Sequence, residues 1–175
     1  MTISNKESAL LGLLCEKSMH PYEVEKEVKY RDMRYWTDLS MSSIYKVLRK
    51  LEEKDYVVSQ TNVTDKNRVT KIYTVTESGK RVMSENVKTL LSKWTNVKTP
   101  IDLAFSNMYL LDKEQIKECL TKYEKSLNET LKGYKDLEKF LQDSNCPIGN
   151  LQLAKRPQEL LKGEIKWLSN FKNEL

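Results

Sequence analysis

The segment from Ser40 to Lys80 reads SMSSIYKVLRKLEEKDYVVSQTNVTDKNRVTKIYTVTESGK and is the most informative part of the chain about its fold. Its first part predicts an amphipathic helix, because apolar side chains recur at i, i+3, i+4 and i+7. These side chains are Ile44, Val47, Leu48 and Leu51. Its second part predicts a two-stranded hairpin, because Tyr56 to Val63 and Val69 to Val75 alternate around the turn residues TDKN. A basic helix followed by a basic hairpin can hold duplex DNA at two places, the major groove and the backbone.

Two further helices are expected before this stretch. Apolar spacing predicts the first from Ser8 to Lys17, and a first-turn proline begins the second, from Pro21 to about Tyr30. Ser40 is the expected N-cap of the third, since its hydroxyl can accept a bond from a first-turn N–H. Helix, helix, helix and hairpin is the order of a winged helix-turn-helix, so we expect a mainly α protein with a small β-hairpin.

The rest of the chain is expected to be helical. Thr76 should cap a fourth helix that runs through Trp94 and stops before Pro100. We therefore expect a winged helix-turn-helix domain over 1–80, a linking helix over 81–99 and an all-helical dimerisation domain over 100–175. Within the last, a short helix covers 101–111, and the capping box Asp112/Gln115 opens a long helix. Pro157 either starts the final helix or kinks it.

The long helix carries a heptad seam about four repeats long. The seam can pack inside its own subunit or pair with a second chain, and we favour the second because the C-terminal half has little else to cover it. The residues predicted to form the dimer are Leu120, Tyr123, Leu127, Tyr134, Leu137, Leu141, Leu161, Ile165, Trp167, Leu168 and Phe171.

The outward face of the third helix and the hairpin are the predicted DNA-binding surface, since basic and hydroxyl side chains contact phosphates and base edges. An ordinary solvated helix face is the alternative, and the basic hairpin that follows argues against it. The net charge is +5, and residues 1–97 hold most of the excess, with 17 Lys and Arg against 13 Asp and Glu. The predicted residues are Ser42, Ser43, Tyr45, Lys46, Arg49, Lys50, Lys66, Arg68 and Lys71.

Other classes of function find no support in the sequence. His20 is the only histidine, no phosphate-binding glycine motif occurs, and no spacing suits a metal, so we expect no enzyme, no metal and no cofactor. No apolar run is long enough to span a membrane, and no secretory signal is visible. The three widely spaced cysteines favour free buried thiols in a reducing cytoplasm, and we expect a cytoplasmic protein.

Trp94 is the one aromatic side chain with a ligand-binding alternative. Core or interface packing is the simpler role for each tryptophan of the chain. Trp94 lies late in the helix between the two halves, where a flat aromatic wall suits a small-molecule pocket. It is therefore our candidate for an effector contact.

Three motifs together resemble the PadR family of transcriptional regulators over roughly residues 8–82. Residues 20–23 (HPYE) resemble the family's HGYE, residues 43–52 (SIYKVLRKLE) its recognition helix S/T-L-Y-P-x-L-x-R-L-E, and residues 71–80 (KIYTVTESGK) its K-Y-Y-x-L-T-x-x-G-R. The C-terminal half is similar to the longer subgroup with an all-helical dimerisation domain. This chain departs from the pattern at Pro21, at Lys46 and in the thinned basic wing, where Arg68 and Lys71 remain.

The resemblance implies a homodimeric repressor that binds a pseudo-palindromic operator in double-stranded DNA and is released by a small-molecule effector. The competing class is a protein–protein adaptor, because winged helices also serve as such modules. Sequence-dependent binding to the DNA upstream of the gene separates these two classes.

Overall fold

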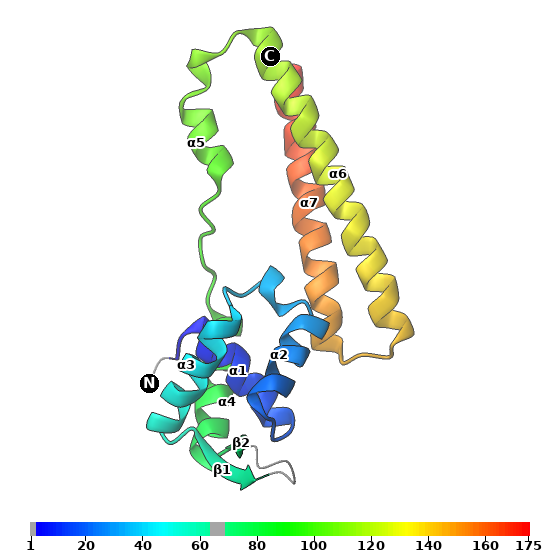
Figure 1. Ribbon diagram of the computed structural model, residues 1–175. Coiled ribbons are helices and arrows are strands. Elements are labelled where there is room, and N and C mark those ends of the chain that lie inside the picture. The colour runs from blue at the N-terminus through cyan, green and yellow to red at the C-terminus, as the bar shows by residue number, and fades with distance from the viewer. Residues whose placement is uncertain (1–2, 64–68) are drawn as a thin grey trace. The chain divides into compact units, whose positions relative to one another are not determined.

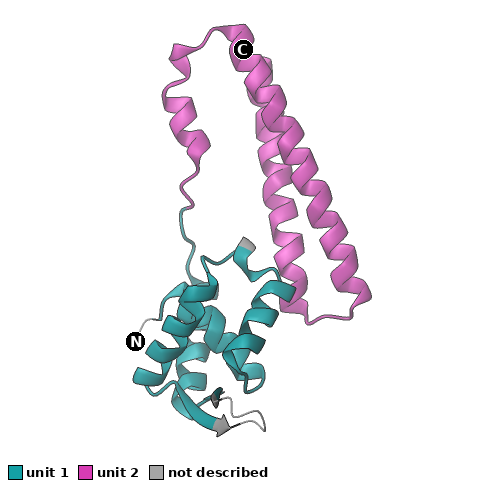
Figure 2. Ribbon diagram, in the orientation of Figure 1, with its two compact units in different colours: residues 1–96 teal, residues 97–175 magenta. Residues whose placement is uncertain are grey.

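The structure is a computed structural model that describes residues 3–63 and 69–175. The chain divides into two compact units, Met1–Asn96 and Val97–Leu175 (Figure 2). The first unit contains α1 (Asn5–Glu16), α2 (Pro21–Tyr30), η1 (Met33–Tyr35), α3 (Met41–Glu53), β1 (Val57–Val63), β2 (Val69–Val75) and α4 (Glu77–Ser92) (Figure 1). The second contains α5 (Pro100–Ser106), η2 (Met108–Leu110), α6 (Lys113–Asp143) and α7 (Ile148–Glu174).

The first unit has the predicted order of a winged helix-turn-helix. The core lies between α1, α2 and α3, and the predicted stripe of α3 is buried, with Leu48 and Leu51 at 0% exposure. Ser40 is the N-cap of α3 as predicted, and its side chain accepts a hydrogen bond from the Ser43 amide. Helix α1 begins before the predicted Ser8, because Ser4 and Glu7 form a capping box at its start.

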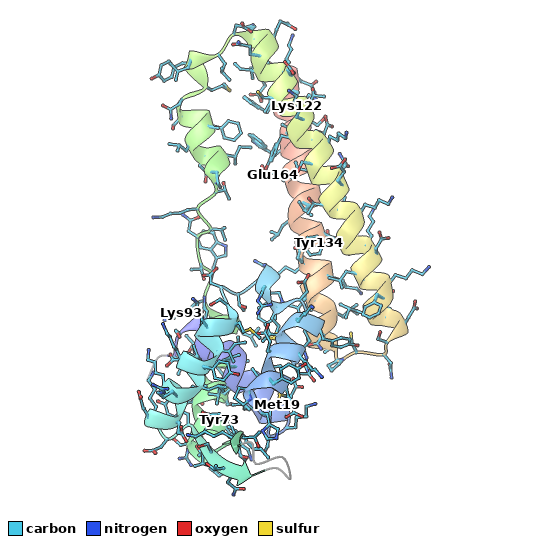
Figure 3. The ribbon with its side chains drawn as sticks, viewed as in Figure 1. Met19, Tyr73, Lys93, Lys122, Tyr134 and Glu164 are labelled. Carbon is cyan, nitrogen blue, oxygen red and sulfur yellow. The ribbon has the colours of Figure 1, made fainter. Side chains whose placement is uncertain are left out.

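The hairpin is antiparallel, and its register pairs Val57 with Val75 and Ser59 with Tyr73. Met19, in the turn between α1 and α2, extends this small sheet. Its amide and carbonyl exchange hydrogen bonds of 3.1 and 3.0 Å with Tyr73 (Figure 3). The base of the hairpin is thereby fixed to the turn that precedes α2.

Helix α4 begins after the predicted cap, Thr76, which bonds the segment between α3 and β1. The Thr76 hydroxyl donates to the Asp55 carbonyl at 2.7 Å and accepts from the Gly79 amide at 3.0 Å. The helix approaches Tyr56, the residue before β1, so closely that a β-carbon on Gly79 would lie 2.1 Å from the Tyr56 carbonyl oxygen. Only glycine fits this position without a shift of the backbone.

The predicted linking helix over 81–99 is wrong in its extent. Helix α4 already begins at Glu77, packs on α1 and ends at Ser92, so residues 93–99 are not helical. Exposure explains the early end. Leu91 and Trp94 remain 84% and 85% exposed, so no burial within the first unit stabilises further helix.

The second unit is built on the antiparallel pair α6 and α7. The capping box of Asp112 and Gln115 opens α6 as predicted. Pro157 lies inside α7, which begins at Ile148, so this proline does not start the final helix. The predicted short helix over 101–111 is split into α5 and η2 around Asn107.

The heptad seam packs within its own chain, contrary to the interpretation that we favoured. Ile116, Leu120 and Leu127 of α6 are buried together with Leu168 of α7. The side chains that pack around them include Tyr123, Leu161, Ile165 and Phe171. Leu120, Leu127 and Leu168 are covered because α7 folds back along α6 and supplies the apolar partner that we assigned to a second chain, whereas the side chains around them are only partly buried.

Part of the predicted dimer surface stays accessible. Leu137 and Trp167 are 38% and 40% exposed, and Tyr134 and Leu141 are half-buried. Trp167 stacks on Phe171 with ring centroids 5.4 Å apart, and Phe105 of α5 meets both rings edge-on. This aromatic contact holds α5 against α7, and the dimer role of the half-buried and exposed residues stays a prediction.

The cysteines and the helices bear on two further predictions. Cys15 and Cys119 are free but exposed, not buried as predicted, because each lies on the outer side of its helix. Over residues 3–63 and 69–175, no helix combines the length and the apolar character that crossing a membrane requires.

Candidate nucleic-acid interface

The outward face of α3 presents Ser42, Tyr45, Lys46 and Arg49 to solvent. Their arrangement follows from the helix period, because the buried stripe occupies the opposite face. Tyr45 is 56% exposed although it is aromatic. Lys46 and Arg49 lie one turn apart, so their charges belong to one patch. We call these four residues the α3 face.

Lys46 and Arg49 differ from Lys50, Lys54 and Lys71, which each lie near an acidic side chain. Within the described residues, neither forms an ion pair or a side-chain hydrogen bond. Lys50, which we also predicted to bind DNA, lies 3.6 Å from the Glu7 carboxylate. Its contact therefore points it toward α1, and its role at DNA stays a prediction.

Glu7 is a buried carboxylate that the sequence analysis did not single out. Its side chain is 3% exposed, and Oε1 accepts a hydrogen bond of 2.5 Å from the Lys54 ammonium. Its Oε2 accepts from the Ser4 amide and hydroxyl at 2.8 and 2.9 Å. Burial raises the pKa of Glu7, but the hydrogen bonds from Lys54 and Ser4 outweigh it and bring that pKa to about 2. Glu7 thus fastens the C-terminal end of α3 to α1.

The hydroxyl groups at the start of α3 are partly occupied. Ser43 donates to the Ser40 carbonyl at 2.7 Å and accepts from the Ser40 amide at 2.8 Å, which completes the capping box. Ser42 lies 3.2 Å from the Ser40 hydroxyl and is exposed. Ser42 is therefore the freer of the two predicted contacts, and Ser43 acts first as part of the cap.

The hairpin contributes one described residue to the predicted surface. Lys71 of β2 is half-exposed and lies 3.8 Å from Oε2 of Glu52 near the end of α3. Its backbone carbonyl is 2.9 Å from Nδ1 of His20, which caps α2. Lys66 and Arg68, the other predicted wing residues, lie outside the described residues. His20 thus has a structural role, because it joins the start of α2 to β2.

Tyr73 shows how close the charges at the end of α3 lie to the hairpin. It is 7% exposed. Burial raises its pKa, the Glu52 carboxylate raises it further, and the Arg49 guanidinium lowers it. Arg49 of the α3 face and Glu52 therefore both act on the strand that carries Lys71.

Sequence reasoning missed Glu7, Glu52 and Met19. A signal existed for Glu7, because Ser4 followed by Glu7 has the spacing of a capping box. No local signal marks Glu52 or Met19, since their partners lie in other elements.

Trp94 lies beyond the end of α4 and is exposed, and its role as an effector contact stays a prediction. In the part of the chain that the structure describes, no three His, Cys, Asp or Glu side chains come together as a metal site.

The fold and the α3 face define a winged helix-turn-helix protein with an all-helical C-terminal unit. The sequence model of the transcriptional regulator PadR-like family matches residues 10–85, which is the winged-helix part. The chain belongs to this family.

The comparisons with individual proteins agree with that assignment. An uncharacterised protein of Lysinibacillus sphaericus is 30% identical over 97 residues, which cover 55% of this chain and 84% of that protein. The negative transcriptional regulator PadR of Bacillus subtilis is 26% identical over 118 residues, which cover 67% of this chain and 59% of that protein.

Solved structures of Bacillus subtilis PadR share the fold with this chain. Its crystal structure in complex with operator DNA matches with a TM-score of 0.77 at 21% identity, over 96% of this chain and 97% of that chain. Its crystal structure in complex with p-coumaric acid matches with a TM-score of 0.76 at 21% identity, over 96% of each chain. The match extends over both the winged helix and the helical unit.

Proposed function

We propose that the chain is a sequence-specific DNA-binding repressor that acts as a homodimer on a pseudo-palindromic operator. The observation that carries this proposal is the α3 face, where Lys46 and Arg49 are exposed and pair with no described residue. Exposed cations without an acidic partner can neutralise phosphates or bond guanine edges without first breaking an internal contact. The α3 face lies on the third helix of a winged helix-turn-helix, the element that enters the major groove in this class.

In this proposal, each residue of the α3 face has a stated part. Tyr45, Lys46 and Arg49 contact base edges and the flanking phosphates, and Ser42 bonds the backbone or a base edge. Lys66 and Arg68 hold the wing to the DNA backbone, and Lys71 contributes less, because its ammonium lies 3.8 Å from the Glu52 carboxylate. Ser43 and Lys50 contribute less, because their polar groups already bond Ser40 and Glu7.

The homodimer is supported by the apolar side chains that the second unit leaves exposed. Leu103, Tyr109 and Leu110 are each at least 69% exposed, and Phe140 of α6 is 59% exposed. Large apolar surface of this kind favours association. A two-fold axis would also place two α3 helices one duplex turn apart, as a pseudo-palindromic operator requires. Sedimentation equilibrium is expected to give twice the mass of 20.5 kDa, and a monomer at micromolar concentration would contradict the dimer.

The DNA-binding part is tested by titrating labelled DNA from upstream of the gene and following fluorescence anisotropy. We expect the Lys46→Ala/Arg49→Ala variant to lose affinity at least tenfold, because a base contact contributes about 1–3 kcal/mol. Lys132→Ala/Lys135→Ala on α6 removes the same charge from exposed, unpaired positions in the described part of the chain, and should change affinity little.

Two results would contradict the proposal. Equal affinity of the α3 variant and the wild-type protein would remove the α3 face from the DNA contact. Absence of any sequence-dependent binding at low salt would instead favour the protein–protein adaptor. Repression is tested with a reporter gene behind the same DNA, where loss of the protein is expected to raise expression.

The proposal includes release of the operator by a small molecule. Its support is that Bacillus subtilis PadR, which shares the fold, forms a complex with p-coumaric acid. Phenolic acids are therefore the first compounds to titrate into the DNA complex, with a Trp94→Phe variant as the test of the predicted contact. A DNA complex that no phenolic acid dissociates would contradict this effector class.

A further inference from the structure

Glu52 joins the third helix to both strands of the hairpin. It is the residue before the last in α3, and its side chain is 32% exposed. Oε1 accepts a short hydrogen bond from the Ser59 hydroxyl of β1. Oε2 lies 3.8 Å from the Lys71 ammonium of β2. One carboxylate therefore contacts one residue on each strand.

The register of the hairpin explains why a single side chain can reach both strands. Ser59 is paired with Tyr73, and Thr61 is paired with Lys71. Side chains two residues apart lie on the same face of a strand, so Ser59, Tyr73 and Lys71 share one face of the hairpin. That face is turned toward the end of α3, because Glu52 contacts it.

The two contacts have different physical weights. The Ser59 bond is charge-assisted and holds the position of β1 relative to α3. The ion pair between Glu52 and Lys71 is longer and half-exposed, so it contributes little to stability. It nevertheless holds the Lys71 ammonium beside Glu52, where this charge is less available to a DNA phosphate. Further ties of the hairpin run from Ser18, Met19 and His20 to β2, and all three residues precede α2. Glu52 adds the tie to α3 itself.

We propose that Glu52 is a positioning residue for the DNA-binding surface, which fixes the wing to α3 through Ser59 and restrains Lys71. This inference rests on the proposed function, because it assigns to Glu52 the control of the distance between α3 and the wing, the two elements that contact DNA. The Glu52 carboxylate thus favours operator DNA, which contacts both α3 and the wing, over unrelated DNA, which is bound only through its phosphate charges.

The chain provides a matched control for this test. Glu53 is the next residue of α3, is exposed and forms no ion pair with a described residue. Glu52→Gln and Glu53→Gln therefore change the net charge equally at neighbouring positions. Glutamine can still accept the Ser59 hydroxyl but cannot pair with Lys71, whereas Glu52→Ala can do neither.

The first measurement is amide hydrogen exchange in the DNA-free protein. We expect Glu52→Ala to exchange the β1 and β2 amides about threefold to tenfold faster than Glu53→Ala does, the range expected when one hydrogen bond is removed. Glu52→Gln is expected to restore the wild-type rate within about twofold, because it keeps the acceptor. Equal exchange in Glu52→Ala and Glu53→Ala would overturn the tie between α3 and the wing.

The second measurement compares operator DNA with an unrelated sequence over a range of salt concentrations. We expect Glu52→Gln to steepen the salt slope by up to about 0.9 per protomer relative to Glu53→Gln, because Lys71 becomes free for phosphate. Its preference for the operator should fall by about 1.5-fold to fivefold, which is the contribution expected of an exposed ion pair. Identical slope and preference in the two variants would overturn the restraint of Lys71.

The two measurements separate this inference from the proposed function. A wild-type protein that prefers no DNA sequence would refute the function and, with it, the effect on operator preference. The exchange experiment needs no DNA, so it decides the tie between Glu52 and the wing in either case.

Discussion

Replacing Gly79 with alanine is expected to destabilise the winged helix, although alanine favours helices in general. The added β-carbon would lie 2.1 Å from the Tyr56 carbonyl oxygen and 2.9 Å from Cγ2 of Val75. Ordinary contacts begin near 3.4 Å, so the backbone must move by about 1 Å. The Tyr56 oxygen cannot move freely, because it accepts from the amide and the hydroxyl of Thr76 at 3.0 and 3.1 Å.

The magnitude follows from the terms that oppose each other. Overpacking costs about 1–3 kcal/mol, and weakening the two hydrogen bonds costs about 1 kcal/mol each. The higher helix propensity of alanine returns about 1 kcal/mol. The net loss is about 2–4 kcal/mol, which lowers the urea midpoint by about 1–2 M at a slope near 2 kcal/mol/M.

Urea unfolding, followed by circular dichroism and tryptophan fluorescence, measures this shift. Gly133→Ala is the matched control, because a β-carbon on Gly133 of α6 meets nothing within 4 Å. That variant is expected to gain about 0.5–1 kcal/mol, as an exposed helix position should. If Gly79→Ala unfolds at or above the wild-type midpoint, the close approach of α4 to Tyr56 is not the constraint that we describe.

Three other predictions concern pH, the second core and salt. The pKa of Glu7 is lowered from 4.5 to about 2 in the folded protein, so its stabilisation is complete above about pH 4.5 and is lost as the pH falls toward 2. As the pH falls over this range, the free energy of unfolding of the wild-type protein should decrease by up to roughly 3 kcal/mol more than that of Glu7→Gln. Urea titrations at each pH measure this difference, and an equal decrease in both proteins would exclude the stabilising role of the Glu7 carboxylate. Leu168 is fully buried, so Leu168→Ala should cost about 2–5 kcal/mol, whereas Leu160→Ala, on an exposed site of the same helix, should cost much less in thermal unfolding. For the DNA complex, Lys46→Ala or Arg49→Ala should flatten the salt slope by about 0.9 per protomer for each phosphate that the side chain neutralises, and an unchanged slope would show that the residue binds no phosphate.

Local sequence patterns were sufficient to predict the elements of the winged helix. The stripe of Ile44 and Leu48 buries one face of α3, and Ser40, Thr76 and Asp112 cap helices where we expected caps. These features were predictable because they depend on residues within one or two turns of each other, and helix and strand periods are local properties. The α3 face follows from the same reasoning, since the residues outside a buried stripe must be exposed.

The pairing of residues that are distant in the sequence became clear from the folded chain. The seam of α6 could pack against any apolar helix, and the return of α7 with Leu168 showed that the partner lies in the same chain. The pairing of charged side chains also depends on the tertiary structure. Glu7 bonds Lys54 across 47 residues, and Glu52 reaches Lys71 across the hairpin, so the cations left free for DNA could not be identified from spacing alone. Helix α4 ended early for a related reason, because its last apolar residues have no partner within the first unit to bury them.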